Sequence, residues 1–219
     1  CYTKYNKGDV DAGGFDSDYR SKNCVIQYNY SHDNEWGALL VCNQGSGEGF
    51  NDSTIVRYNI FQNEAHHVIR VSGEPTNTII HNNIIYTGPE MSNVDIIWHK
   101  NWKGYPDKTI YYNNIFYNLG ENNRYDFGKS TNNLFDYNIF YGKPVENEPR
   151  DANKITSDPL FVDPGMGKMG FSSILGYQIK KGSPAINSGK KIVGNTNKDF
   201  WGNPIDDNQE IDRGVMELK

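Results

Sequence analysis

The sequence has few cysteines, no run of basic residues and no long apolar stretch. Its three cysteines, Cys1, Cys24 and Cys42, cannot all pair with one another, and their spacing matches no zinc motif. A formal net charge of −5 without a basic run argues against nucleic acid as a partner. No segment approaches the roughly 20 apolar residues that a membrane span needs. The 219 residues suit one elongated domain.

What the sequence does contain is a repeat built around asparagine. Five segments share it: CVIQYNYSHDN, TIVRYNIFQNE, TIIHNNIIYTG, TIYYNNIFYNL and NLFDYNIFYGK. The common position holds Asn29, Asn59, Asn83, Asn114 and Asn138, at spacings of 30, 24, 31 and 24 residues. A period in this range is typical of a solenoid, in which each repeat buries its apolar face only against its neighbours.

Each repeat is expected to form short strands around its Asn. The segments are rich in β-branched and aromatic residues and are bounded by Gly, Asn, Asp and Pro, which favours strands over helices. Apolar residues occupy both alternating faces, so the pattern leaves open which face is interior. The Asn itself is expected to adopt the left-handed conformation of a sharp bend, and its amide to bond to the equivalent Asn one rung away.

A second set of strand-like segments lies between the Asn segments. Its members are 13–18, 37–43, 67–73, 94–101 and 124–130. If they stack, they form another sheet of the same solenoid. Loops of variable length, such as 43–53 and 87–93, carry the insertions, and such loops on a rigid scaffold are where binding normally occurs.

The strand–Asn–strand units resemble the right-handed parallel β-helix of the pectate-lyase-like superfamily. The stretch 13–34 is similar to a stretch in secreted bacterial β-helix proteins that act on carbohydrates, and DPLFVDP, GSPAINSG, DFWGNP and IDRGVMEL resemble their closing segment. The resemblance implies an all-β, right-handed parallel β-helix with rungs over 1–141 and an irregular C-terminal capping segment over 142–219. It also implies a polysaccharide or other glycan as partner, and a secreted or bacterial cell-surface location.

The N-terminal region shows neither a signal peptide nor a recognisable cap. A bare solenoid end would expose unpaired strands and an open core. We therefore expect this chain to be the C-terminal portion of a longer secreted protein, with further N-terminal rungs in the same polypeptide.

The candidate catalytic residues are Asp16, Asp18, His32, Asp33 and Arg70. Asp16 and Asp18 are two residues apart on one predicted strand, so their side chains point to the same face. A close carboxylate pair suits acid/base chemistry or cation binding. Arg70 is expected level with Asp16, because each lies 13 residues before an Asn of the repeat.

A polar and aromatic face is expected beside these residues as a groove for an acidic or neutral sugar chain. The candidate substrate-binding residues are Trp36, Trp98, His99, Lys100, Arg124 and Asp126. Structural roles compete with these assignments: Asp16 and Asp18 could cap a turn, His32 and Asp33 could close one, and Arg70 could form an ion pair.

Three functions fit these residues. The preferred one is a glycoside hydrolase with Asp16 or Asp18 as the acid and a second acid, such as Asp33 or Asp126, as base or nucleophile. The second is a lyase acting on a uronate polymer, with Arg70, Lys100 or a His as base and Ca²⁺ held by Asp16 and Asp18. The third is a non-catalytic glycan-binding or cell-surface module. No cofactor is certain, and Ca²⁺ belongs to the second alternative.

Overall fold

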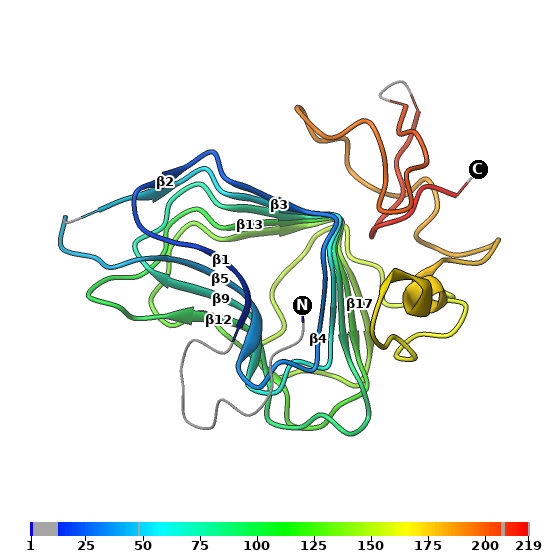
Figure 1. Ribbon diagram of the computed structural model, residues 1–219, viewed down its shortest axis with the longest axis horizontal. Coiled ribbons are helices and arrows are strands. Elements are labelled where there is room, and N and C mark those ends of the chain that lie inside the picture. Colours follow the sequence, from blue (N-terminus) through cyan, green and yellow to red (C-terminus); the bar gives the residue numbers. More distant parts are fainter. Residues whose placement is uncertain (2–12, 48, 207–208, 219) are drawn as a thin grey trace.

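A computed structural model describes residues 1, 13–47, 49–206 and 209–218 of the chain. The strands wind into an all-parallel β-solenoid of about five turns, which confirms the predicted β-helix (Figure 1). Three five-stranded sheets form its walls, and a two-stranded sheet forms at one corner.

Each wall takes one strand from every turn. Sheet 1 contains β1 (Gly13–Ser17), β5 (Gly37–Asn43), β9 (His67–Gly73), β12 (Asp95–Lys100) and β15 (Arg124–Asp126). Sheet 2 contains β3 (Val25–Gln27), β7 (Ile55–Arg57), β10 (Ile79–His81), β13 (Ile110–Tyr112) and β16 (Leu134–Asp136). Sheet 3 contains β4 (Tyr30–His32), β8 (Ile60–Gln62), β11 (Ile84–Thr87), β14 (Ile115–Asn118) and β17 (Ile139–Gly142). The corner sheet pairs β2 (Ser21–Lys22) with β6 (Asn51–Asp52). The second set of predicted segments is sheet 1, so its predicted stacking is confirmed.

The structure decides which face of the Asn segments is interior. The residue three before each Asn and the residue two after it point into the solenoid, as Val56 and Phe61 do at 0% exposure. Aromatic side chains stack there from turn to turn, for example Phe116 on Phe140 with ring centroids 5.0 Å apart. The residue one after each Asn points outward instead, into a second apolar cluster.

The predicted asparagine ladder is present at the corner between sheets 2 and 3. Each side-chain amide donates to the Oδ1 of the next Asn, with N···O distances of 2.9–3.1 Å from Asn29 to Asn138. The last Asn donates to Asp151 Oδ2 at 2.9 Å, so a carboxylate ends the ladder. These bonds satisfy buried amides that would otherwise cost about 1–3 kcal/mol each.

The left-handed backbone position was assigned to the wrong residue. The residue before each ladder Asn takes the positive φ, and these residues are Tyr28, Tyr58, Asn82, Asn113 and Tyr137, at φ of 51–60°. The ladder Asn is needed for its amide rather than for its backbone. Tyrosine takes the left-handed position in three turns, and the rings of two of these residues, Tyr28 and Tyr58, pack against each other.

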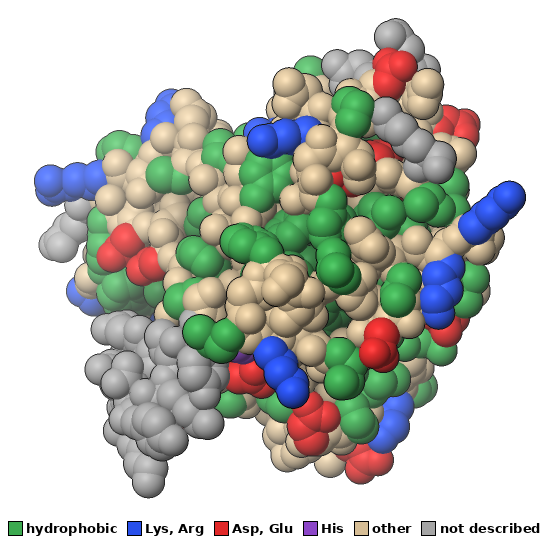
Figure 2. All heavy atoms as spheres, turned by 45° about the vertical axis from the view of Figure 1, so that its right-hand side comes forward, with side chains coloured by type: hydrophobic (Ala, Val, Ile, Leu, Met, Phe, Trp, Pro, Cys, Tyr) green, Lys and Arg blue, Asp and Glu red, His purple; other side chains and the backbone are tan. Residues whose placement is uncertain are grey.

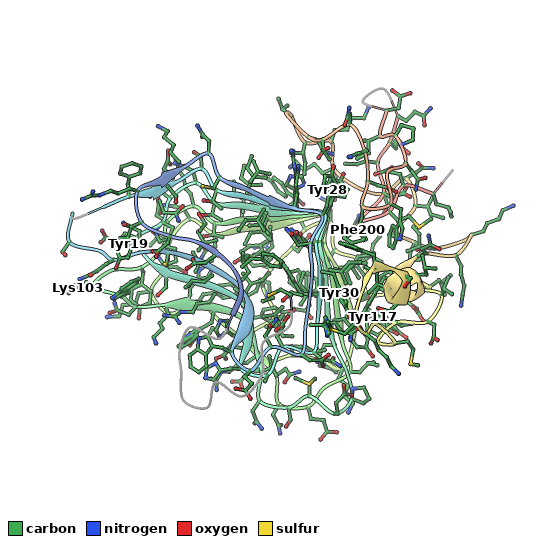
Figure 3. The ribbon with its side chains drawn as sticks, viewed as in Figure 1. Tyr19, Tyr28, Tyr30, Lys103, Tyr117 and Phe200 are labelled. Atoms are coloured by element: carbon green, nitrogen blue, oxygen red, sulfur yellow. The ribbon has the colours of Figure 1, made fainter. Side chains whose placement is uncertain are left out.

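The C-terminal segment packs on the outer face of sheet 3 (Figure 1). It is irregular apart from a 3₁₀ helix, η1 (Phe171–Tyr177), and its apolar side chains meet the outward residues of the sheet. Figure 3 shows Tyr30 and Tyr117 between this sheet and the segment. Isolated parallel bridges continue the solenoid pattern to Ile155, through Phe135–Asp151 and Ile139–Ile155.

Figure 2 shows acidic and basic side chains scattered over the face that carries the C-terminal segment, without separation by sign. Arg213 ties the segment to the solenoid by donating to the carbonyl oxygens of Asn138 and Asn153 at 3.0 and 2.9 Å. Within the described residues, no helix has the length and hydropathy that crossing a membrane requires.

Candidate active site on the open face of sheet 1

The strand register of sheet 1 aligns one row of outward side chains. The row runs through Asp16, Leu40, Arg70, Trp98 and Asp126. Arg70 therefore lies level with Asp16, as the spacing to the Asn repeat predicts. All five side chains are half-buried or exposed, whereas the alternate residues Ser17, Val41 and Val71 point inward and are buried.

Asp16 and Asp18 form a carboxylate pair at the end of β1. One carboxylate oxygen from each lies within 4.8 Å of the other and of the Sγ of Cys42, and both Asp residues are exposed. Asp18 Oδ1 accepts the backbone N–H of Tyr19 at 2.7 Å and the thiol of Cys42 at 3.1 Å. The alternation of the strand thus produces the same-face pair that the sequence predicts.

A cleft of about 430 Å³ opens over this pair. Its walls are Asp16, Asp18, Leu40, Cys42, Arg70, Lys100, Asn101 and Trp102. The indole of Trp102 is braced by Tyr19, with ring centroids 5.3 Å apart. Figure 3 shows Tyr19 and Lys103 at the same end of the solenoid, where the loops between sheets 1 and 2 project.

A smaller hollow of about 130 Å³ adjoins the cleft and shares Asp16, Leu40 and Arg70 with it. Trp36 and His67 line its other side. Gly37 is required here, because a Cβ at this position would come within 2.5 Å of the His67 ring. The two spaces form one groove that runs across the turns.

Aromatic rings form the floor of the groove beside this hollow. Trp36 stacks on His66 with centroids 4.1 Å apart, and His66 lies 5.6 Å from Trp98. The Trp98 ring carries Lys100 Nζ at 4.6 Å and the Arg70 guanidinium at 5.3 Å from its centroid. Flat aromatic faces next to cations suit both the faces of sugar rings and their polar or anionic substituents.

The basic groups in the groove are shifted by burial and by one another. Burial, with a smaller contribution from Arg70, lowers the pKa of His67 to about 3. Burial also lowers the pKa of His66, and burial followed by Arg70 lowers the pKa of Lys100. Both imidazoles are therefore neutral at pH 7, so among the described residues that line the groove the cations are Arg70 and Lys100.

Arg124 and Asp126 lie at the far end of the row and have partners in the protein. Arg124 binds Asp95 through both carboxylate oxygens, at 2.5 and 3.2 Å. The hydrogen bond and charge of Asp95 raise the pKa of Arg124. Asp126 accepts the backbone N–H of Gly128 at 3.0 Å. These contacts give both residues a structural role at the edge of sheet 1.

Three predicted site residues lie elsewhere. His32 ends β4 on sheet 3 and Asp33 follows it; His32 Nδ1 lies 2.8 Å from Asp33 Oδ2, and the His32 ring stacks on Tyr30. His99 points into the solenoid, with its ring nitrogens 2.9 Å from Tyr111 Oη and 2.8 Å from Ser130 Oγ. Burial lowers its pKa to about 3. Strand alternation explains this placement, since His99 lies between the outward residues Trp98 and Lys100.

The sequence reasoning missed Cys42 as a site residue, because 37–43 was interpreted only as one of the stacking strands. Two features of the sequence could have placed Cys42 at the site. Alternation places Cys42 on the face of Leu40, and the rung spacing places Leu40 beside Asp16. Cys24, the cysteine one turn of chain earlier, is half-buried.

Asp16, Asp18 and Cys42 are also a group whose ligand atoms lie close enough to hold a metal ion. The donor set fits calcium poorly. Ca²⁺ takes six to eight oxygen ligands, and a thiol is not one of them. Burial, followed by the hydrogen bond to Asp18, raises the pKa of Cys42, which keeps the thiol protonated. The chemistry of the cluster is therefore that of two carboxylates with a thiol donor.

The stacked sheets and the cleft on sheet 1 define the class as a parallel β-solenoid protein with an acid-lined groove. The chain is similar to a lacto-N-biosidase of Bifidobacterium longum subsp. longum, at 28% identity over 228 residues. The alignment covers 90% of this chain and 13% of that relative's length. No protein-family profile matches the chain. Similarity to a glycoside hydrolase fits a carbohydrate-active β-helix.

Proposed function

We propose that this chain carries the cleavage site of a glycoside hydrolase that acts on an extracellular or cell-surface glycan. The observation that carries the proposal is the Asp16–Asp18 pair, with carboxylate oxygens within 4.8 Å, in an open cleft of about 430 Å³. Similarity to a lacto-N-biosidase supports this reaction over others available to β-helix proteins. Because the aligned region is a small part of that relative, its substrate is one candidate among several glycans.

The geometry favours Asp16 and Asp18 as partners of each other. Carboxyl groups about 5 Å apart are typical of retaining glycosidases, in which one acts as nucleophile and the other as acid and then base. Asp126 is four strands from Asp16 along the row, or about 19 Å at the usual strand spacing, which is too far for a retaining or an inverting pair. Asp33 lies beyond β4 on sheet 3.

The hydrogen bonds support a division of roles within the pair. Two donors converge on Oδ1 of Asp18, so we assign Asp18 as the carboxylate that attacks the anomeric carbon as the glycosidic bond breaks. Asp16 then gives its proton to the leaving oxygen. In the second step Asp16 takes a proton from water as the water oxygen attacks the anomeric carbon, which breaks the bond to Asp18 and releases the sugar with retained configuration.

The rest of the groove would hold the sugar chain. The indoles of Trp36, Trp98 and Trp102 offer flat apolar surfaces on both sides of the pair. Arg70 and Lys100 provide donors for hydroxyl or carboxylate groups next to the scissile bond. A chain held on both sides is positioned against Asp16 and Asp18 for reaction.

The test uses the longest natural polypeptide that carries this sequence. It is incubated with acidic and neutral plant, algal and host polysaccharides and with aryl glycosides, including an aryl lacto-N-bioside. Asp18→Asn is expected to lose about a thousandfold in kcat on every substrate. Asp16→Asn is expected to keep substantial kcat/KM on aryl glycosides, because their leaving groups need no proton, while its kcat falls because the second step has lost its base.

The control variant is Glu121→Gln, which removes an exposed carboxylate whose salt bridge to Lys143 lies outside the groove. It should behave as the wild type. Unchanged turnover in both Asp16→Asn and Asp18→Asn would overturn the proposal. Glycan retention without any product would point instead to a binding module.

Elimination from a uronate polymer is the second candidate, favoured by one observation. Lys100 lies in the same cleft, and burial lowers its pKa toward the range of a general base. A lyase would generate an unsaturated sugar with ultraviolet absorbance, would lose activity in Lys100→Ala, and would depend on Ca²⁺ if Asp16 and Asp18 held it. Following absorbance and reducing ends together separates the two reactions in one sample.

A further inference from the structure

The carboxylate pair has a third member that glycoside hydrolysis does not require. Cys42 comes from β5, one turn after the strand that carries Asp16, and its Sγ lies 3.1 Å from Asp18 Oδ1. The residue is 2% exposed, although it lines the cleft. An outward position that holds a covered thiol against a carboxylate is a specific contact, since a valine would suit the strand equally well.

In the contact between Cys42 and Asp18, the thiol is the donor and the carboxylate is the acceptor. Burial, the hydrogen bond to Asp18 and the charge of Asp16 all raise the pKa of Cys42, so the thiol carries its proton wherever the carboxylates are ionised. A protonated thiol donates, and an ionised carboxylate only accepts. A thiol that is both protonated and covered is also a poor nucleophile.

The two hydrogen bonds on Asp18 fix how its carboxylate is turned. The N–H of Tyr19 and the thiol of Cys42 both go to Oδ1. Among the described residues, every hydrogen bond that the Asp18 carboxylate accepts is on this oxygen. One donor alone would leave the carboxylate free to rotate about that contact, whereas two donors, one from the turn after β1 and one from β5, hold it. Oδ2 is then the oxygen presented to the cleft.

We propose that Cys42 is a positioning residue that holds Asp18 in the orientation needed for attack on the sugar. The inference rests on the proposed function, in which Asp18 is the nucleophile. Cys42 forms no bond to substrate and changes no oxidation state. Its loss would leave the groove able to bind glycan but would misalign the attacking oxygen, and misplacement of a reacting group lowers kcat more than it raises KM.

The experiment compares two variants that separate hydrogen bonding from packing. Cys42→Ser keeps a donor in a smaller side chain, and Cys42→Val fills the site without a donor. We expect Cys42→Val to lose about tenfold in kcat, equivalent to about 1.4 kcal/mol, with KM within about twofold of the wild type. Cys42→Ser should stay within about threefold of the wild type. The control is Cys24→Val, at a half-buried cysteine outside the cleft, which should leave kcat unchanged.

A packing role predicts the opposite order, with Cys42→Val active and Cys42→Ser impaired and less stable to heat. That order, or equal kcat in all variants of an active enzyme, would overturn the role of Cys42 and leave the proposed function standing. Absence of wild-type turnover on every glycan would overturn the proposed function, and this inference with it. Thermal unfolding of each variant confirms that the compared proteins are folded.

Discussion

The outer faces of sheets 1 and 3 belong to the same solenoid, but the C-terminal segment covers only the face of sheet 3. Sheet 3 presents Ile60, Ile84 and Ile115, each at most 1% exposed beneath the C-terminal segment. Sheet 1 presents Asp16, Arg70 and Trp98 at corresponding outward positions, and the C-terminal segment does not cover them. Both faces are backed by the same inward core. The difference shows that the outward residues of each strand, rather than the winding of the solenoid, determine whether a face becomes a packing surface or a groove.

Truncating one aliphatic side chain on each face gives the largest expected contrast. Ile115→Ala, at 0% exposure, should reduce the free energy of unfolding by about 3 kcal/mol, since it removes buried apolar surface and leaves a cavity. Leu40→Ala, the matched change on the half-buried open face, should cost less than about 1 kcal/mol. Urea denaturation measures both. Equal losses would mean that the two faces do not differ in packing.

Glu64 is a buried carboxyl group, in contrast to the exposed Asp16 and Asp18, and its burial should make stability depend on pH. It lies just after β8, fully buried against Ser31 and Asn34, and burial raises its pKa to about 8. The unfolded chain releases this proton near pH 4.5, whereas the folded chain keeps it until about pH 8. Stability should therefore fall as pH rises through this window, at no more than about 1.4 kcal/mol per pH unit, and level off above it.

Glu64→Gln removes the titration while preserving the shape of the side chain. Subtracting its unfolding free energy from that of the wild type between pH 4 and 9 should isolate the fall. A difference that is flat across this range would show that Glu64 is not held protonated by the fold.

The smallest expected effect concerns sugar binding on the open face. Trp98→Ala should weaken glycan retention about tenfold, because it removes an aromatic surface together with the support for Lys100, while barely changing stability. Trp201→Ala, which removes an indole packed on Phe200 in the C-terminal segment, should leave retention unchanged. Affinity electrophoresis through the retained glycan compares them. Equal retention by Trp98→Ala and the wild type would contradict an aromatic floor to the groove.

Part of the site follows from local rules and part does not. Strand alternation suffices to place Asp16 and Asp18 on one face, and counting back from the Asn repeat suffices to bring Arg70 level with them. The same alternation, applied one residue further, would have turned His99 inward. Asp33 and Asp126 needed more than alternation, because the sheet that carries Asp33 and the number of strands that separate Asp126 from Asp16 depend on how the turns stack.

By itself, the sequence determined the period, the strands and the asparagine ladder, because these depend on residues a fixed distance apart that repeat in every turn. It also determined that one strand would carry two acids on one face. Only the tertiary structure decided which apolar face became the interior, since both faces of the Asn segments are apolar and the C-terminal segment covers the outer one. The stacking of turns brought Cys42 to Asp18 across 24 residues of chain. That contact depends on the register between neighbouring strands, which no single repeat encodes.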